Sequence, residues 1–223
     1  MKRFDQYCPM AHALSLVGER WALLIVRELR PGPRRFTDLV DGLPGISRKL
    51  LTERLRNLGR DGIVARRHLP PPAARQVYEL TEDGRELATA LVPLIAWGAR
   101  RMGDRRAGET SCARWAAVGM AALADRAAAE GVRETYQYVV GDSAFHFVVD
   151  DGSIEVRDGY AEDPRAVVTT DEATWADIVA GMTPASAARA AGALSVTGDR
   201  GAARRLSKIF ARDHILARAN GNA

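Results

Sequence analysis

The sequence predicts an α+β chain of two domains, and three observations support this. Its 223 residues, 47% hydrophobic and 27% charged, are enough to bury a core in one large or two small globular domains. Residues 1–106 contain 20 Lys and Arg against 12 Asp and Glu, a net charge of +8, whereas residues 107–223 contain 12 against 16, a net charge of −4. Helical periodicity fills most of the first half, and alternating strands are frequent in the second. We therefore expect a first domain over residues 1–103, a linker over 104–110 and a second domain over 111–223.

The first half begins with three short helical segments. Pro9 is suited to a helix start and Gly18 to a helix stop. A second apolar run at helical spacing follows and ends at Pro31, and a third ends at Pro44. Three helices are therefore expected before the stretch GISRKLLTERLRNLGRDGI.

That stretch predicts a fourth helix from Ser47, as N-cap, to about Arg60. One arc of this helix is apolar and consists of Leu51, Leu55 and Leu58. The opposite side is a polar ridge of residues three or four apart: Arg48, Lys49, Thr52 and Arg56. Arg54 falls inside the apolar arc, so we expect it to pair with a carboxylate of a neighbouring helix, such as Glu28. The ridge itself is either a solvated face or a surface for a large anion.

A predicted β-hairpin follows the fourth helix. After Gly62, the runs IVARRHL and QVYEL have β character and are joined by the stiff segment PPPAAR. Thr81, followed by two acidic residues, is suited to cap one more helix. Three helices with a hairpin after the last form the winged helix-turn-helix arrangement.

Ridge and hairpin together favour double-stranded DNA as the partner. The ridge alone would more simply be a solvated face, but the hairpin adds a second basic element. Its cationic residues are Arg66, Arg67, His68 and Arg75. We expect Ser47 and the ridge to face the major groove, and Arg66, Arg67 and Arg75 to hold the DNA backbone or minor groove.

The second half predicts a mainly antiparallel sheet with helices. A helix is expected over residues 111–129, and three strands follow, with Asp150-Asp151-Gly152 as the turn between the last two. A strand, two helices, a strand and a closing helix complete the pattern. Several apolar side chains either enclose a ligand cavity or fill a core, and periodicity does not distinguish the two. They are Phe145, Phe147, Trp175, Ile178, Val179, Met182, Leu206 and Phe210.

No pattern of catalytic or metal-binding residues is present. The four histidines lack metal-ligand spacing, and no phosphate-binding loop or nucleophile motif occurs, so we expect neither an enzyme nor a cofactor or metal site. Cys8 lies just before the first helix, whose N-terminal end favours a thiolate; it is either a redox or electrophile sensor or a partly packed residue. No apolar run could span a membrane and no signal peptide is evident, so a cytoplasmic protein without a membrane partner is expected.

The first half resembles the HxlR family of bacterial transcription regulators. The resemblance rests on CPMAHALSLVGERW, GISRKLLTERLRNLGRDGI, VYELTEDG and PLIAWG, in this order. It implies a winged-helix homodimer, paired through its first and last helices, on a two-fold-symmetric operator. It places the recognition helix at 47–60 and the wing at about 64–80, and makes repression the expected direction. Some family members sense electrophiles through an N-terminal cysteine, a position similar to that of Cys8.

The second half is similar to the sterol-carrier-protein-like domain. The segments EDPRAVVTTDEATWADIVAGM and AAGALSVTGDRGAARRLSKIF carry the resemblance, which implies a hydrophobic tunnel for an apolar or lipid-like ligand. The combined expectation is a transcriptional regulator whose DNA affinity changes when such a ligand binds. Two alternatives remain open: a thiol-based sensor acting through Cys8, and a lipid-binding or carrier protein in which the winged helix serves assembly.

Overall fold

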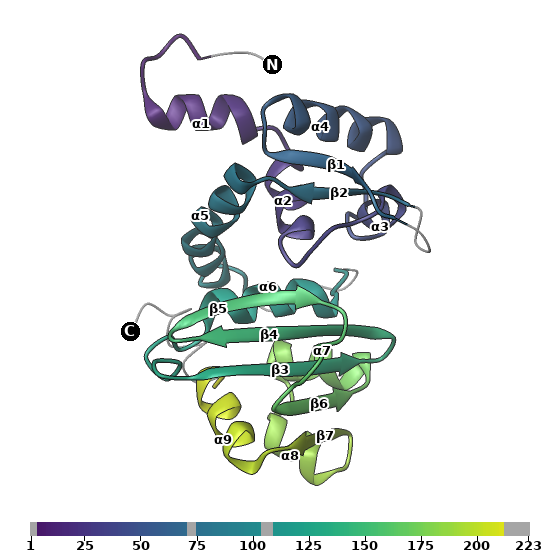
Figure 1. The fold of residues 1–223 in the computed structure, drawn as a ribbon, viewed down its shortest axis with the longest axis vertical. Coiled ribbons are helices and arrows are strands. Elements are labelled where there is room, and N and C mark those ends of the chain that lie inside the picture. Colours follow the sequence, from purple (N-terminus) through teal and green to yellow (C-terminus); the bar gives the residue numbers. More distant parts are fainter. Residues whose placement is uncertain (1–3, 71–74, 104–108, 212–223) are drawn as a thin grey trace. The chain divides into compact units, whose positions relative to one another are not determined.

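The computed structural model describes residues 4–70, 75–103 and 109–211, which form two compact units (Figure 1). The first unit is Met1–Leu91 and the second is Val92–Ala223. Residues 104–108 of the expected linker lie outside the described residues. No described helix has the length and apolar character needed to cross a membrane.

The first unit contains four helices, a β-hairpin and the start of a fifth helix. The elements are α1 (Pro9–Val17), α2 (Ala22–Leu29), α3 (Phe36–Asp41), α4 (Arg48–Arg60), β1 (Val64–His68), β2 (Gln76–Leu80) and α5 (Glu82–Ala99). This order confirms the expected winged helix-turn-helix arrangement. The residues expected at the hairpin tip are described only in part, because 71–74 lie outside the described residues.

The core of the first unit is aliphatic. It gathers the inner faces of the helices and the base of the hairpin, with fully buried side chains such as Ile25, Val26, Leu39, Leu43, Leu51 and Leu58. Glycine is needed where α5 packs on the hairpin: a Cβ at Gly84 would lie 2.1 Å from the carbonyl oxygen of Ile63. The recognition helix expected from the sequence is thus one wall of a compact helical core.

The second unit contains a five-stranded sheet with helices packed on it. The elements are α6 (Ala113–Leu123), β3 (Arg133–Val140), β4 (Ser143–Asp150), β5 (Ser153–Asp158), β6 (Ala166–Thr170), α7 (Glu172–Ala180), α8 (Ala185–Ala190), β7 (Leu194–Gly198) and α9 (Arg200–Ile209). The strand order is β5-β4-β3-β6-β7, and every neighbouring pair is antiparallel except β3 and β6. The expected mainly antiparallel sheet is confirmed.

The first helix of this unit is shorter than the sequence suggests. The alanine-rich run was expected to stay helical over 111–129, but α6 ends at Leu123, because Ala124 is extended. The Asp125 carboxylate then accepts a hydrogen bond at 3.0 Å from the backbone N–H of Ala128. A short carboxylate side chain competes with helix formation in this way, whereas alanine propensity alone favours continuation.

The connection from β5 to β6 must cross β4 and β3, and it does so on the sheet face opposite α6 (Figure 1). Gln137, on β3, is 2% exposed and ties this connection down. Its Nε2 donates to the carbonyl of Phe145 at 2.9 Å, and its Oε1 accepts from the N–H of Ala161 at 2.7 Å. A single buried amide thus joins two strands and the crossover segment.

Candidate nucleic-acid interface

Helix α4 is formed and seated by signals within its own sequence. The Ser47 hydroxyl accepts a hydrogen bond at 3.2 Å from the N–H of Leu50 and so caps the helix, as expected. Leu51, Leu55 and Leu58 are at most 4% exposed and hold its inner face on the core. Burying this apolar arc leaves the opposite face of α4 open to solvent.

The open face of α4 carries the polar ridge. Its members Arg48, Lys49, Thr52 and Arg56 are all exposed, and so is the N-cap Ser47 before them. Among the described residues, no ion pair holds any of the three cations; the Arg48 guanidinium only lies 5.9 Å from the ring centre of Phe36. The Thr52 hydroxyl donates to the carbonyl of Arg48 at 2.9 Å, which leaves its oxygen lone pair and its methyl group facing outward. The ridge therefore offers cations, an acceptor and a methyl group to a large anion.

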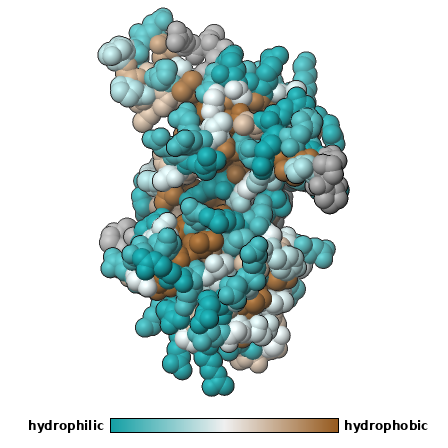
Figure 2. Space-filling model, viewed as in Figure 1, coloured by the Kyte–Doolittle hydropathy of each residue, from teal (hydrophilic) through white to brown (hydrophobic). Residues whose placement is uncertain are grey.

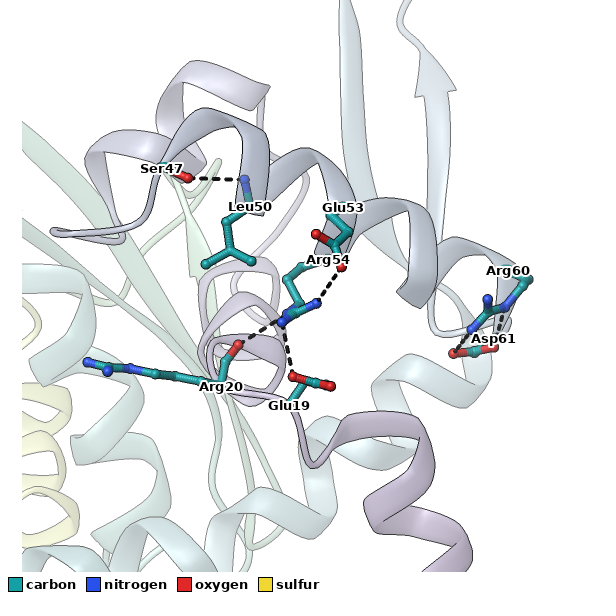
Figure 3. A network of polar contacts seen from close by, with 8 residues as sticks. All are labelled: Glu19, Arg20, Ser47, Leu50, Glu53, Arg54, Arg60 and Asp61. Carbon is teal, nitrogen blue, oxygen red and sulfur yellow. Dashed lines mark hydrogen bonds and ion pairs between the residues drawn. The ribbon is translucent and has the colours of Figure 1, made fainter. Parts of the chain in front are cut away.

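Arg54 is directed toward Glu19 and Arg20, in the loop before α2 (Figure 3). Its guanidinium contacts Glu19 at 3.0 Å and Glu53 at 3.2 Å, and its side chain is only 13% exposed. The expected role in packing is therefore supported, but the expected partner Glu28 is wrong. Glu28 instead lies 2.7 Å from the Arg27 guanidinium. The Arg54 side chain meets the loop before α2 rather than the body of that helix, and helical periodicity does not show this.

The hairpin places its arginines on opposite faces. Successive side chains of a strand alternate, so Arg66 and Arg67 diverge. Arg66 donates a short hydrogen bond to Gln76, and Arg67 forms an ion pair with Glu79 at 3.0 Å. Arg75 is exposed at the start of β2. Unlike the three ridge cations Arg48, Lys49 and Arg56, both strand arginines already have a partner on the neighbouring strand.

A third backbone segment supports the hairpin, and sequence reasoning missed it. Arg34 and Tyr78 exchange backbone hydrogen bonds of 2.9 and 2.7 Å, which adds one residue of extended chain beside β2. The signal was present in Pro31-Gly32-Pro33, because a proline ends a helix and favours extended backbone at its own position and at the residue before it. The wing is therefore attached to the chain between α2 and α3 as well as to α4.

The candidate ligand residues of the second unit fall into two groups. Phe145, Phe147, Trp175, Leu206 and Phe210 are at most 9% exposed, whereas Ile178 is half-buried and Val179 and Met182 are 46% and 66% exposed. The buried aromatic rings touch one another, with ring centres 5.9 Å apart for Phe145 and Trp175 and 4.5 Å apart for Phe147 and Phe210. The Trp175 indole N–H, although buried, has no hydrogen-bond partner among the described residues.

A polar cluster anchors α9 beside this aromatic core. The Arg205 guanidinium donates to both oxygens of the Glu134 carboxylate, and the Tyr136 hydroxyl donates to the same group at 2.6 Å. Burial raises the pKa of Glu134, but the hydrogen bonds from Arg205 and Tyr136 outweigh this and leave its pKa below the usual value. Burial, followed by the hydrogen bond to Glu134, raises the pKa of Tyr136. The cluster is a structural tie from α9 to β3.

Cys8 is exposed and occupies the N-cap position of α1. Its side chain makes no capping hydrogen bond there. The described residues hold no group of three or more side chains suited to bind a metal ion.

Comparisons with known proteins agree with this geometry. Residues 16–106 match the HxlR-like helix-turn-helix family, and residues 118–211 match the SCP-2 sterol transfer family. The HTH-type transcriptional regulator YodB of Bacillus subtilis is 42% identical over 91 residues, which are 40% of this chain and 81% of YodB. The uncharacterized HTH-type transcriptional regulator Rv3095 of Mycobacterium tuberculosis is 47% identical over 89 residues, 40% of this chain and 56% of that protein.

Among solved structures, the reduced form of YodB from B. subtilis covers 43% of this chain and 94% of its own, with 38% identity and a TM-score of 0.38. The family match falls on the half that contains α4 and the hairpin, and the YodB match spans most of that relative. The chain therefore belongs to the HxlR-like family of helix-turn-helix transcriptional regulators, and a domain of the SCP-2 sterol transfer family follows its winged helix.

Proposed function

We propose that this regulator binds a two-fold-symmetric DNA operator as a homodimer and represses transcription there, with an apolar ligand in the second unit altering its affinity. The observation that carries the DNA part is the open ridge on α4, whose cations have no internal ion-pair partner among the described residues. Arg48, Lys49 and Arg56 are suited to guanine edges and phosphates, and Thr52 is suited to a base edge or a thymine methyl group.

The hairpin fits a different part of the DNA. Arg66, Arg67 and Arg75 are suited to backbone phosphates or the minor groove, where sequence is read less strictly. Arg67 is paired with Glu79, so on binding DNA it would exchange this carboxylate for a phosphate. Its contribution to DNA affinity is then smaller than that of an unpaired cation.

The test of DNA binding is selection of duplexes from a random pool by the full-length protein, followed by titration at several salt concentrations. We expect log affinity to fall linearly with log salt, by a slope of about 0.9 for each phosphate contacted. If no duplex is enriched and no salt-dependent affinity is found, the DNA proposal fails and the lipid-carrier reading is favoured.

The homodimer proposal rests on exposed apolar side chains of the helices that the family uses for pairing. On and just before α1 these are Phe4, Tyr7, Met10 and Leu14, and on α5 they are Leu94 and Trp97, each at least 47% exposed. Hydrophobic residues are also visible in the region of α1 in Figure 2. Exposed apolar side chains on a helix are typical of a surface that a second copy covers. The two α4 helices of the dimer would then lie about 34–36 Å apart, one turn of DNA.

A charge placed on the exposed face of α1 tests pairing directly. We expect Leu14→Glu to convert the dimer to a monomer in sedimentation experiments and to lower affinity for a two-fold-symmetric duplex more than for half of it. A Leu14→Glu protein that remains dimeric would refute this pairing surface.

The ligand proposal rests on the aromatic interior of the second unit. The cluster around Phe145, Phe147 and Trp175 is apolar, and the unpaired indole N–H of Trp175 is a donor that a carbonyl or carboxylate oxygen of a ligand would satisfy. We infer that an apolar molecule with one polar end enters by rearranging these rings and changes how the two winged helices are spaced.

Mass spectrometry of solvent extracts from the purified protein would identify the molecule. Affinity for the selected duplex, measured at fixed salt before and after extraction, tests the coupling. Equal affinities in the two states would exclude coupling by that ligand.

A thiol switch is the second candidate, because Cys8 is exposed at the start of α1, the helix assigned to pairing. In this case diamide would change DNA binding by the wild type and not by Cys8→Ser, whatever ligand is present. In both cases we propose a regulatory rather than catalytic protein that acts where its DNA lies, in the cytoplasm.

A further inference from the structure

The loop between α1 and α2 is held in a strained conformation. Trp21 has a φ of +82°, in the left-handed region that a residue with a side chain rarely adopts. Gly18 closes α1 with a backbone hydrogen bond to Leu14 at 2.9 Å, and a Cβ at Gly18 would lie 2.4 Å from that carbonyl oxygen. Strained backbone of this kind persists only where neighbouring contacts fix it.

Arg54 supplies the directional contacts. From the middle of α4 its guanidinium donates to the Glu19 carboxylate at 3.0 Å and to the Arg20 carbonyl at 3.4 Å (Figure 3). Glu53 takes a third hydrogen bond at 3.2 Å. These hydrogen bonds use all three guanidinium nitrogens, and the side chain is only 13% exposed, so little of Arg54 is accessible to a phosphate.

The loop also lies against the turn that precedes α4. A Cβ at Gly45 would lie 3.8 Å from Cη2 of Trp21, so the indole ring lies against the turn that leads into the Ser47 cap. The loop thus contacts the turn that leads into α4 and, through Arg54, the middle of the helix itself. Two separated contacts fix the direction of a helix axis. The leucines on the inner face of α4 fix mainly its distance from the core, because hydrophobic contacts have no preferred direction.

We propose that Arg54 is a positioning residue, which sets the tilt of α4 on DNA by tying it to the loop that ends α1. This inference rests on the proposed function, in which the ridge of α4 reads base edges. Base-reading contacts tolerate little displacement, because bidentate hydrogen bonds require both direction and distance. The preference for one DNA sequence then depends on Arg54, a side chain that touches no DNA. The loop connects Arg54 to α1, the helix assigned to subunit pairing.

The test compares Arg54→Lys and Glu19→Gln with Arg60→Ala in the full-length protein. Arg60 lies on the same helix, but within the described residues its ion pair is with its neighbour Asp61, so it is the matched control. Two probes are used: a duplex selected from a random pool by the wild type, and a random-sequence duplex of equal length. Lysine keeps the charge of Arg54 and loses the planar fork that reaches carboxylate and carbonyl together.

We expect Arg54→Lys to bind the selected duplex roughly tenfold more weakly, the size of one lost base-reading contact, with a salt dependence equal to that of the wild type. Glu19→Gln should also weaken binding to the selected duplex, but by a smaller factor. The affinity of both variants for random duplex should stay within about twofold of the wild-type value. Glu19 is 49% exposed, so its variant tests the proposal even if Arg54→Lys fails to fold.

Two results would overturn the inference. A shallower salt dependence, by about one phosphate, would show that Arg54 contacts DNA directly. Lower melting temperatures with unchanged preference for the selected duplex would show a role in folding alone. If the wild type itself prefers no duplex, the proposed function fails, and that outcome is distinct from both.

Discussion

Removing the guanidinium of Arg205 should destabilise the second unit in a pH-dependent way. Arg205→Ala takes both guanidinium hydrogen bonds from Glu134, whose side chain is only 12% exposed, and leaves it the Tyr136 hydroxyl. A fully buried pair would lose about 3–5 kcal/mol on such a change, and an exposed pair about 0–1 kcal/mol. Because the Arg205 side chain is 41% exposed, we place the loss at about 1–2 kcal/mol at neutral pH. For a unit of this size that is a fall of about 4–8 °C in Tm.

The sign of the pH dependence follows from the Glu134 carboxylate. Its pKa is lowered in the folded state, so its stabilising contribution is present above the unfolded pKa of about 4.3 and is lost as pH falls through the folded value. The difference in Tm between wild type and Arg205→Ala should therefore be constant from about pH 7 to pH 5.5 and shrink below about pH 4.

Thermal unfolding followed by circular dichroism measures this difference, with Arg204→Ala as control. Arg204 is the exposed neighbour of Arg205 on α9 and has no ion pair among the described residues. A similar fall in Tm for both variants, or a fall for Arg205→Ala that persists at low pH, would refute the reasoning.

Three further outcomes are expected. Leu55→Ala, at a site 4% exposed in α4, should lower the free energy of unfolding by about 2–5 kcal/mol in urea titrations, because it leaves a cavity under the recognition helix. Arg56→Ala should weaken binding to the selected duplex by roughly 5- to 150-fold. Arg67→Ala should instead weaken binding to the selected and the random duplex by the same factor. If each variant weakened both duplexes equally, Arg56 would not be the base-reading residue of the two. Gly84→Ala should destabilise the first unit in the same titrations, since the new Cβ meets the Ile63 carbonyl at 2.1 Å and backbone must move; an unchanged midpoint would show that the contact relaxes freely.

Sequence reasoning predicted the elements that depend on local signals. The α4 helix follows from the Ser47 cap and the leucine spacing, and both are properties of neighbouring residues. The β4–β5 turn follows from Asp151 and Gly152, which adopt φ values of +46° and +83°. Each of these elements needs only a few consecutive residues to be specified.

The parts that were missed depend on residues far apart in the chain. The charge and position of Arg54 indicated a buried ion pair, but the choice of Glu19 over Glu28 depends on how the loop before α2 is folded back, including the left-handed Trp21. The Arg34 segment beside β2 likewise joins residues that no periodicity connects. For the ligand residues, spacing indicated an apolar interior, but it could not separate the buried Phe147 from the exposed Met182.

The placement of Gln137 has a consequence for the order in which the second unit folds. Strands β3, β4 and β5 are joined by tight turns and can pair early, whereas β6 joins β3 in parallel only after its connection has crossed the sheet. The Gln137 amide cannot complete its hydrogen bonds until that crossing is in place, and a buried amide lacking them is costly. The three-stranded meander of β3, β4 and β5 is therefore unstable by itself. Completion of the crossover makes the sheet a single cooperative unit. Hydrogen exchange of the Ala161 amide should report that final step, because Gln137 is the acceptor of its hydrogen bond in the described part of the chain.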